Sequence, residues 1–231
     1  MDILPLIINN LNYKIDNNFI LKDINIITSE RDVTIIAGNN GSGKSTLLKI
    51  LHGLINVSQN TIKWGNYKIS DVKKNQSMVF QNPILLNRTT NENLIYVINK
   101  KNIKDKYYIE EIIEKLNLEN IIDLKTKYLS GGERQKVAIA MAIIGNPKII
   151  FLDEPTSQLD PVYKNEIECI IDSLAKDNTK IFMTSHDISQ IRRIGKEIIF
   201  LNYGEVIYQN SVFKFFKEKQ CDLIENYINY G

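Results

Sequence analysis

The segment VTIIAGNNGSGKST, residues 33–46, decides the fold class of this chain. It begins with apolar and β-branched residues that are typical of a buried strand, and a helix is expected directly after it. Between the two, Gly38–Ser45 fits the pattern G-x-x-x-x-G-K-[ST], whose glycines let backbone N–H groups converge on a phosphate. Lys44 can reach the β- and γ-phosphates of a nucleotide, while the hydroxyl of Ser45 can bind Mg²⁺. This setting argues against an ordinary glycine-rich turn.

An alternation of strands and helices extends on both sides of this loop. The residues expected to form strands are Leu4–Ile8, Phe19–Leu21, Ile24–Ile27, Val33–Ala37, Met78–Phe80, Lys148–Leu152, Ile181–Thr184, Glu197–Leu201 and Val206–Gln209. Helices are expected at Ser45–Leu54, Thr89–Asn99, Asp105–Leu116, Ser130–Gly145, Asp160–Ala175 and Asp187–Gly195, with two short ones at the end. We therefore expect one α/β domain over residues 1–231, with a largely parallel sheet and a helical insertion at about residues 83–146.

Two carboxylates follow the buried strand that is expected at Lys148–Leu152. Open α/β sheets bind ligands at the carboxyl ends of their strands, which is where Asp153 and Glu154 would lie. Asp153 is suited to hold Mg²⁺ through its water shell, and Glu154 to polarise the water that attacks a γ-phosphate. A plain polar turn is the alternative, and the phosphate-binding loop upstream argues against it.

The composition excludes several classes of protein. With 43% apolar and 24% charged residues, the chain is neither disordered nor fibrous. A net charge of +2 is too balanced for a protein whose main task is to bind nucleic acid. Cys169 and Cys221 lack metal or redox spacing, which fits a reducing cytosol. The longest apolar run, Val137–Ile144, is far shorter than the ~18 residues that span a bilayer, and the N-terminus lacks the basic start of a secretory signal, so we expect a soluble, intracellular chain.

The residues Leu129–Gln135 read LSGGERQ, and with the two earlier motifs they resemble the ATP-binding cassette of ABC transporters, whose signature is L-S-G-G-x-x-Q. Three further marks of the family are present: Gln81 at the Q-loop, Ser157–Asp160 at the D-loop, and His186 as the switch histidine. The resemblance covers almost the whole chain. It implies the P-loop NTPase fold, with a RecA-like core around a mostly parallel sheet, an antiparallel β subdomain and a helical subdomain.

The resemblance also implies how these motifs act. In the family, two cassettes associate head to tail and enclose two ATP molecules with Mg²⁺, so the first expected partner is a second copy of this chain. Ser130 caps a helix whose first amides are left bare by Gly131 and Gly132, which makes a second anion site. Ser130 and Gly132 would contact the γ-phosphate of ATP held by the other copy. Gln81 would complete the Mg²⁺ shell and sense the transporter, and His186 would hydrogen-bond the γ-phosphate and hold the attacking water.

The expected site therefore has three groups of residues. The catalytic group is Glu154, His186, Gln81 and Lys44, and the Mg²⁺ group is Ser45, Gln81 and Asp153. The residues expected to contact ATP are Gly38, Asn39, Asn40, Gly41, Ser42, Gly43, Lys44, Ser45, Thr46, Ile15, Ser130, Gly131 and Gly132. Ile15 stands where the family usually places an aromatic residue against adenine. Tyr13, two residues earlier on the same strand face, is the alternative, and the sequence leaves this choice open.

A cassette without a membrane span implies a separate transmembrane permease, and an importer implies an extracytoplasmic solute-binding protein. The segment Asn82–Arg88 belongs to the part of the family fold that docks the permease. Both Phe80–Arg88 and Thr184–Arg193 resemble the corresponding stretches of tungstate-type oxyanion importers. The resemblance therefore implies a subunit held at the cytoplasmic face of the membrane, with tungstate as the expected solute and phosphate, molybdate or amino acids as alternatives.

Three other classes of ATPase share these motifs. DNA-repair and chromosome-organising ATPases carry a long coiled coil between the Q-loop and the signature, whereas Gln81 to Ser130 is short and has no sustained heptads. Translation-associated proteins fuse two cassettes, and each motif occurs once here. A single-cassette ATPase of iron–sulfur assembly, which works without a permease, stays open, and co-purification with a membrane protein or with soluble scaffold proteins would discriminate.

Overall fold

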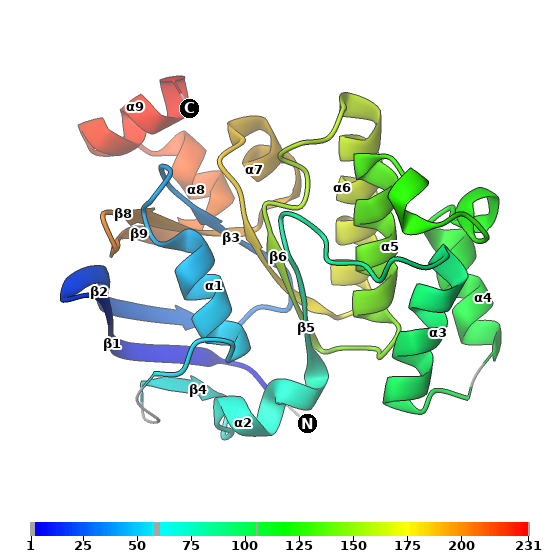
Figure 1. Cartoon of the computed structure of the whole chain (residues 1–231). Helices are drawn as coiled ribbons and strands as arrows, with labels where there is room; N and C mark the ends of the chain where they lie inside the picture. The colour runs from blue at the N-terminus through cyan, green and yellow to red at the C-terminus, as the bar shows by residue number, and fades with distance from the viewer. Residues whose placement is uncertain (1–2, 58–60, 105, 231) are drawn as a thin grey trace.

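The computed structural model describes residues 3–57, 61–104 and 106–230 and is built around a six-stranded sheet (Figure 1). The strand order is β5-β6-β7-β3-β8-β9, with β5 Gln76–Val79, β6 Ile149–Asp153, β7 Lys180–Thr184, β3 Val33–Ala37, β8 Glu197–Asn202 and β9 Glu205–Ser211. Only β9 runs antiparallel to its neighbour. Because β3, β6 and β7 are buried at every position, their sequences are nearly continuous apolar runs. The predicted α/β class with a mostly parallel sheet is confirmed.

A second, antiparallel sheet has the order β2-β1-β4, with β2 Asn18–Thr28, β1 Leu6–Ile15 and β4 Ile62–Trp64. Helix α1, Lys44–His52, lies between the two sheets, and the short α2, Ile69–Val72, follows β4 (Figure 1). The sheets meet at an aromatic cluster in which Phe151 stacks on Phe182 at 5.5 Å, and the buried Trp64 packs edge-on against both rings. Phe151 also meets the ring of His52 at the end of α1 at 5.7 Å, so the cluster packs against that helix.

The helices within residues 83–146 stand at one end of the main sheet (Figure 1). They are α3 Thr90–Lys101, α4 Lys106–Lys115 and α5 Gly131–Ile143, with short 3₁₀ turns at Glu119–Ile121 and Thr126–Tyr128. Capping boxes are present at the start of two of these helices, α3 and α5. Thr89 caps α3 through its pair with Glu92, and Ser130 caps α5 through its pair with Glu133.

The remaining helices are α6 Pro161–Lys176, α7 Ile188–Ile194, α8 Val212–Lys217 and α9 Asp222–Tyr230. Asp160 caps α6 by accepting hydrogen bonds from the amides of Val162 and Tyr163, and Asp187 caps α7 by accepting from the amide of Gln190. Tyr227 of α9 contacts the backbone of Gly38, so this C-terminal helix reaches the start of the phosphate-binding loop.

Two expectations about the first strands are wrong. β1 does not end at Ile8, and the two strands expected at Phe19–Leu21 and Ile24–Ile27 form the single strand β2. Polar residues that were interpreted as turns are bulges instead, with register shifts along the β1–β2 pair and a positive φ of 47° at Asp23. Their side chains satisfy each other across the strands, as when Asn12 Nδ2 donates to Asp23 Oδ1 at 2.9 Å. The three-residue β4 was missed because it is too short to show a period.

Candidate functional site

The phosphate-binding loop, residues 38–45, connects β3 to α1 and is shaped by glycines. Gly38, Gly41 and Gly43 have φ values of 140°, 79° and 102°, a region that other residues rarely adopt. A Cβ at Gly38 would come within 2.1 Å of the carbonyl oxygen of Leu201, so a side chain has no room there. The turn between β8 and β9 is bonded to this loop, because the N–H of Gly204 in the turn donates to the Ser42 carbonyl at 3.1 Å.

The ammonium of Lys44 is buried inside this loop, with 5% of the residue exposed. Its Nζ donates to the carbonyl oxygens of Gly38 at 2.8 Å and Asn39 at 3.0 Å. Burial lowers the pKa of Lys44, and the nearby carboxylates of Glu154 and Asp153 oppose that effect. The hydroxyl of Ser42 is also buried, and no partner is found for it within the described residues. A desolvated cation and an unused hydroxyl in a glycine cradle fit a bound phosphate group.

Two of the three residues predicted to bind Mg²⁺, Ser45 and Asp153, lie where β6, β7 and α1 meet. The hydroxyl of Ser45 donates to Asp153 Oδ1 at 2.7 Å, although 108 positions separate them in the chain. Thr184, at the end of β7, donates to the same carboxylate oxygen at 2.8 Å. A hydroxyl and a carboxylate supply the hard oxygen ligands that Mg²⁺ prefers, and nucleotide phosphates and water usually complete its shell. No cluster of three or more His, Cys, Asp or Glu residues that could hold a metal is found in the described ranges.

Glu154 is the centre of the catalytic group. Nε2 of Gln81 donates to its Oε2 at 3.2 Å, and Nδ1 of His186 lies 3.3 Å from its Oε1. Gln81 also donates to the Ser157 hydroxyl of the D-loop at 3.2 Å. The structure thus brings together Glu154, Gln81 and His186, three of the four residues of the predicted catalytic group. No hydrogen bond between described residues joins Gln81 to Ser45 or Asp153, so its predicted place in the Mg²⁺ shell stays a prediction.

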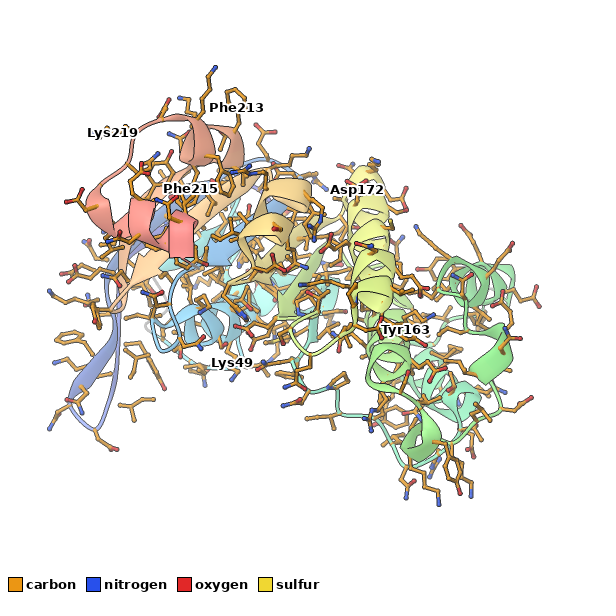
Figure 2. All side chains as sticks on the ribbon, turned by 90° about the horizontal axis from the view of Figure 1, so that it is seen from above. Lys49, Tyr163, Asp172, Phe213, Phe215 and Lys219 are labelled. Atoms are coloured by element: carbon orange, nitrogen blue, oxygen red, sulfur yellow. The ribbon has the colours of Figure 1, made fainter. Side chains whose placement is uncertain are left out.

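The signature residues lie at the start of α5, where Ser130 and Glu133 form hydrogen bonds with each other. Ser130 Oγ accepts from the Glu133 N–H at 3.3 Å, and the hydroxyl proton is still available to donate. A Cβ at Gly132 would lie 2.2 Å from the Tyr163 ring, whereas one at Gly131 would find its nearest neighbour at 3.7 Å. Figure 2 shows Tyr163 at the start of α6, on the side of α5. Within the described residues no hydrogen bond links the signature to the phosphate-binding loop.

The two adenine candidates lie on β1 near the hairpin tip. Ile15 is 49% exposed and pairs with Asn18, while Tyr13 is half-buried and pairs with Leu21. The side chain of Leu21 lies against Gly43, because a Cβ there would be 2.7 Å from it. Residues paired across an antiparallel ladder share a face, so Tyr13 lies on the face that touches the phosphate-binding loop.

Sequence reasoning missed two residues of the site. Thr184 bonds to Asp153 and also accepts from the backbone N–H of Glu154 at 2.8 Å. The sequence did contain a signal for Thr184, because this hydroxyl residue stands at the end of a predicted buried strand. Phe19, half-exposed across from Lys14 and covered by its ammonium at 4.0 Å, is an aromatic beside the adenine candidates. It was interpreted only as part of a strand.

Taken together, these contacts define a class of protein. A phosphate-binding loop, a Ser–Asp pair for Mg²⁺ and a carboxylate at the next position are the parts of a nucleoside triphosphatase. In the described part of the chain, no helix has the length and apolarity needed to cross a membrane.

Comparison with known proteins places the chain within that class. The ABC transporter family matches residues 21–157, which is more than half of the chain. The chain therefore belongs to the ABC transporter family and is an ATP-binding ATPase, as the motifs predicted.

Two curated relatives and two solved structures are similar over most of their length. The tungstate uptake system ATP-binding protein TupC of Peptoclostridium acidaminophilum is 37% identical, covering 80% of this chain and 88% of the relative. The phosphate import ATP-binding protein PstB of Bacillus cereus is 32% identical, covering 95% and 88%. Clostridium perfringens cbiO1, part of the ABC transporter complex cbiONQ, superposes with a TM-score of 0.81 at 28% identity, covering 92% and 90%. The ATP-binding cassette MJ0796, solved as a post-hydrolysis dimer with ADP and Pi, gives 0.76 at 28% identity, covering 90% and 98%.

Proposed function

We propose that this chain is the ATP-hydrolysing subunit of an ABC importer and that Glu154 activates the attacking water. The observation that carries the proposal is the bond between Ser45 and Asp153, which brings the Mg²⁺ ligands to the strand end that also bears Glu154. Bound Mg²⁺ would neutralise charge on the β- and γ-phosphates. Lys44 would bind those phosphates, His186 and Glu154 would hold the water, and Gln81 would position the Glu154 carboxylate.

A second copy of the chain would complete each site. The bare amides at the start of α5 form an anion site, but no hydrogen bond in the described structure connects them to the phosphate-binding loop of the same chain. The likeness to the dimeric MJ0796 cassette supports a head-to-tail arrangement in which Ser130 and Gly132 meet ATP on the partner. In that arrangement the free hydroxyl proton of Ser130 donates to the γ-phosphate.

A groove beside the edge strand β5 suits the permease. It is a hollow of about 290 Å³ between β5, α3 and α5, lined mainly by apolar side chains that include Met78, Phe80, Val97 and Met141. Ile84 at its rim is 82% exposed, which is unusual for a large aliphatic side chain. An apolar helix of a transmembrane permease would bury it and hold the chain at the cytoplasmic face of the membrane. The likeness to cbiO1, part of a transporter complex, supports such a partner.

For the transported solute we propose an oxyanion, with tungstate first and phosphate second. TupC and PstB, the relatives named above, are named for these two anions. A solute-binding protein outside the membrane would deliver the anion to the permease. The decisive measurement is ATP hydrolysis by the chain reconstituted with its permease and solute-binding protein, after addition of tungstate, molybdate or phosphate. We expect tungstate to stimulate at the lowest concentration, and stimulation by phosphate alone would refute that order.

Glu154→Gln tests the catalytic proposal. The amide cannot accept the water's proton, so turnover should fall about 100-fold or more while ATP still binds. Glu110→Gln makes the same charge change on an exposed part of α4 and should leave turnover unchanged. Light scattering with ATP and Mg²⁺ should show a dimer for Glu154→Gln. Wild-type turnover would remove Glu154 from the mechanism, and a strict monomer, even with the permease present, would refute the shared site.

A further inference from the structure

Gln190 on α7 has a buried side chain whose amide group forms three hydrogen bonds. The residue is 1% exposed. Its Oε1 accepts from the Ser185 hydroxyl at 2.8 Å, and its Nε2 donates to the Thr156 hydroxyl at 2.7 Å and to Glu168 Oε1 at 3.0 Å. Both N–H groups of the amide are therefore used, and one carbonyl lone pair accepts. A buried amide satisfied in this way has one orientation available to it.

Two of the three partners of Gln190, Ser185 and Thr156, belong to the two segments that meet at Glu154. Ser185 directly precedes His186, and Thr156 follows Glu154 by two positions. Nδ1 of His186 and Oε1 of Glu154 lie 3.3 Å apart where these segments converge. Gln190 therefore joins, through one rigid amide, the backbone that carries the switch histidine and the backbone that carries the general base.

The amide is in turn anchored between two helices, and Figure 2 shows α7 next to α6. Glu168 of α6 is 5% exposed and receives Arg193 of α7 in a two-pronged contact, with Nε and Nη2 each donating at 2.8 Å. One turn earlier on α6, Lys164 forms an ion pair with Asp187, the residue that caps α7. Two ionic contacts thus fix α7 on α6, and Gln190 lies between them.

We propose that Gln190 is a positioning residue for ATP hydrolysis: it holds the Ser185 and Thr156 segments in register so that the His186 imidazole faces Glu154. The proposal rests on the roles given above to His186 and Glu154. A side chain that served only stability would not need to bond to both of these segments, because apolar residues fill buried positions as well or better.

Gln190→Leu tests the proposal, since leucine has nearly the same volume and no hydrogen-bonding group. We expect kcat to fall about tenfold while the ATP dissociation constant stays within about twofold, because the side-chain hydrogen bonds of Gln190 go to Ser185, Thr156 and Glu168 and not to the phosphate-binding loop. Ser189→Ala, on the exposed side of the same helix, is the matched control and should behave as wild type. Arg193→Gln cuts the ion pair with Glu168 but leaves the bonds to Ser185 and Thr156, so it should lower stability with little effect on kcat.

A spectroscopic measurement separates positioning from stability and needs no hydrolysis. The chain has only two histidines, so the imidazole Cε1–Hε1 signal of His186 can be assigned by NMR with a His52→Gln variant. In Gln190→Leu this signal should shift and broaden, whereas in Ser189→Ala and Arg193→Gln it should stay in place. All measurements are made well below the melting temperature of each variant.

Two outcomes would overturn the inference. One is a Gln190→Leu protein with wild-type kcat and an unmoved His186 signal. The other is a loss of kcat that follows the melting temperature equally in Gln190→Leu and Arg193→Gln. His186→Ala keeps the proposed function distinguishable: if it hydrolyses ATP normally, the catalytic role of His186 fails, whatever Gln190 does.

Discussion

Thr184 holds Glu154 in a left-handed backbone conformation. Glu154 has a φ of 45°, and its N–H donates to the hydroxyl of Thr184 at 2.8 Å. The same hydroxyl donates its proton to Asp153 Oδ1 at 2.8 Å. A non-glycine residue in this conformation stores roughly 1–3 kcal/mol of strain, which the surrounding contacts must offset. One buried side chain on β7 therefore fixes both the Asp153 carboxylate and the backbone that carries Glu154.

Thr184→Val removes that hydroxyl and keeps the shape of the side chain. The buried N–H of Glu154 loses its acceptor, so we expect a loss of about 1–3 kcal/mol of unfolding free energy. We also expect kcat to fall at least about tenfold, because the carboxylate is no longer held in place. Denaturant unfolding and steady-state ATPase assays measure both quantities. Thr184→Ser retains the hydroxyl and should recover most of the activity; equal losses in the two variants would contradict this account.

Tyr13 should contribute more to nucleotide binding than Ile15. It lies on the β1 face that contacts the phosphate-binding loop through Leu21, and ring stacking on adenine is worth about 1 kcal/mol. We expect Tyr13→Ala to weaken ATP binding about fivefold and Ile15→Ala less than about twofold. Calorimetric titration with ATP tests the order, and a larger effect at Ile15 would show that the hairpin tip contacts the base.

Gly132→Ala separates packing from anion binding at the signature. Its Cβ would lie 2.2 Å from Tyr163, and such overpacking costs about 1–3 kcal/mol. The double variant Gly132→Ala/Tyr163→Ala lacks the ring atoms that the methyl group would meet, so it should be about as stable as Tyr163→Ala alone in thermal melts. ATPase activity should stay below that of Tyr163→Ala, because the methyl group changes the packing at the start of α5, where the proposed contact with the partner's ATP lies. If activity returns with stability, Gly132 serves only packing. Gly131→Ala, with 3.7 Å to its nearest neighbour, is the stability control.

Tyr227 on α9 should make the protein less stable at alkaline pH. It is 6% exposed and packs edge-on against Phe200 at 4.8 Å. Burial raises the pKa of Tyr227 to about 12; a backbone contact with Gly38 opposes the shift, and the charges of Glu154 and Asp187 add to it. The folded state therefore keeps this proton to higher pH than the unfolded state, and stability falls as pH rises from about 10 to 12.

Comparison with Tyr227→Phe isolates this effect from the other tyrosines and lysines. Between pH 9 and 11, wild type should lose roughly 1 kcal/mol more unfolding free energy than the phenylalanine variant. Urea unfolding at the two pH values measures the difference. Identical pH dependence would show that the Tyr227 hydroxyl titrates as it does in water.

Much of the fold and the site could be predicted from the sequence because the signals are local. The glycines of residues 38–45, the two capping boxes and the continuous apolar runs of β3 and β6 each act within a few neighbouring residues. The first strands were mispredicted because their polar bulges are satisfied by cross-strand side chains such as Asn12 and Asp23, which no short window reveals.

The sequence by itself predicted a phosphate-binding loop, the motifs of the family and the two carboxylates at the strand end. Only the tertiary structure decided which residues orient that chemistry. Ser45 meets Asp153, Thr184 holds Glu154, and Gln190 joins Ser185 to Thr156. The reason is physical: β6, β7 and β3 are neighbours in the sheet but far apart in the chain, and their order follows from how the whole core packs.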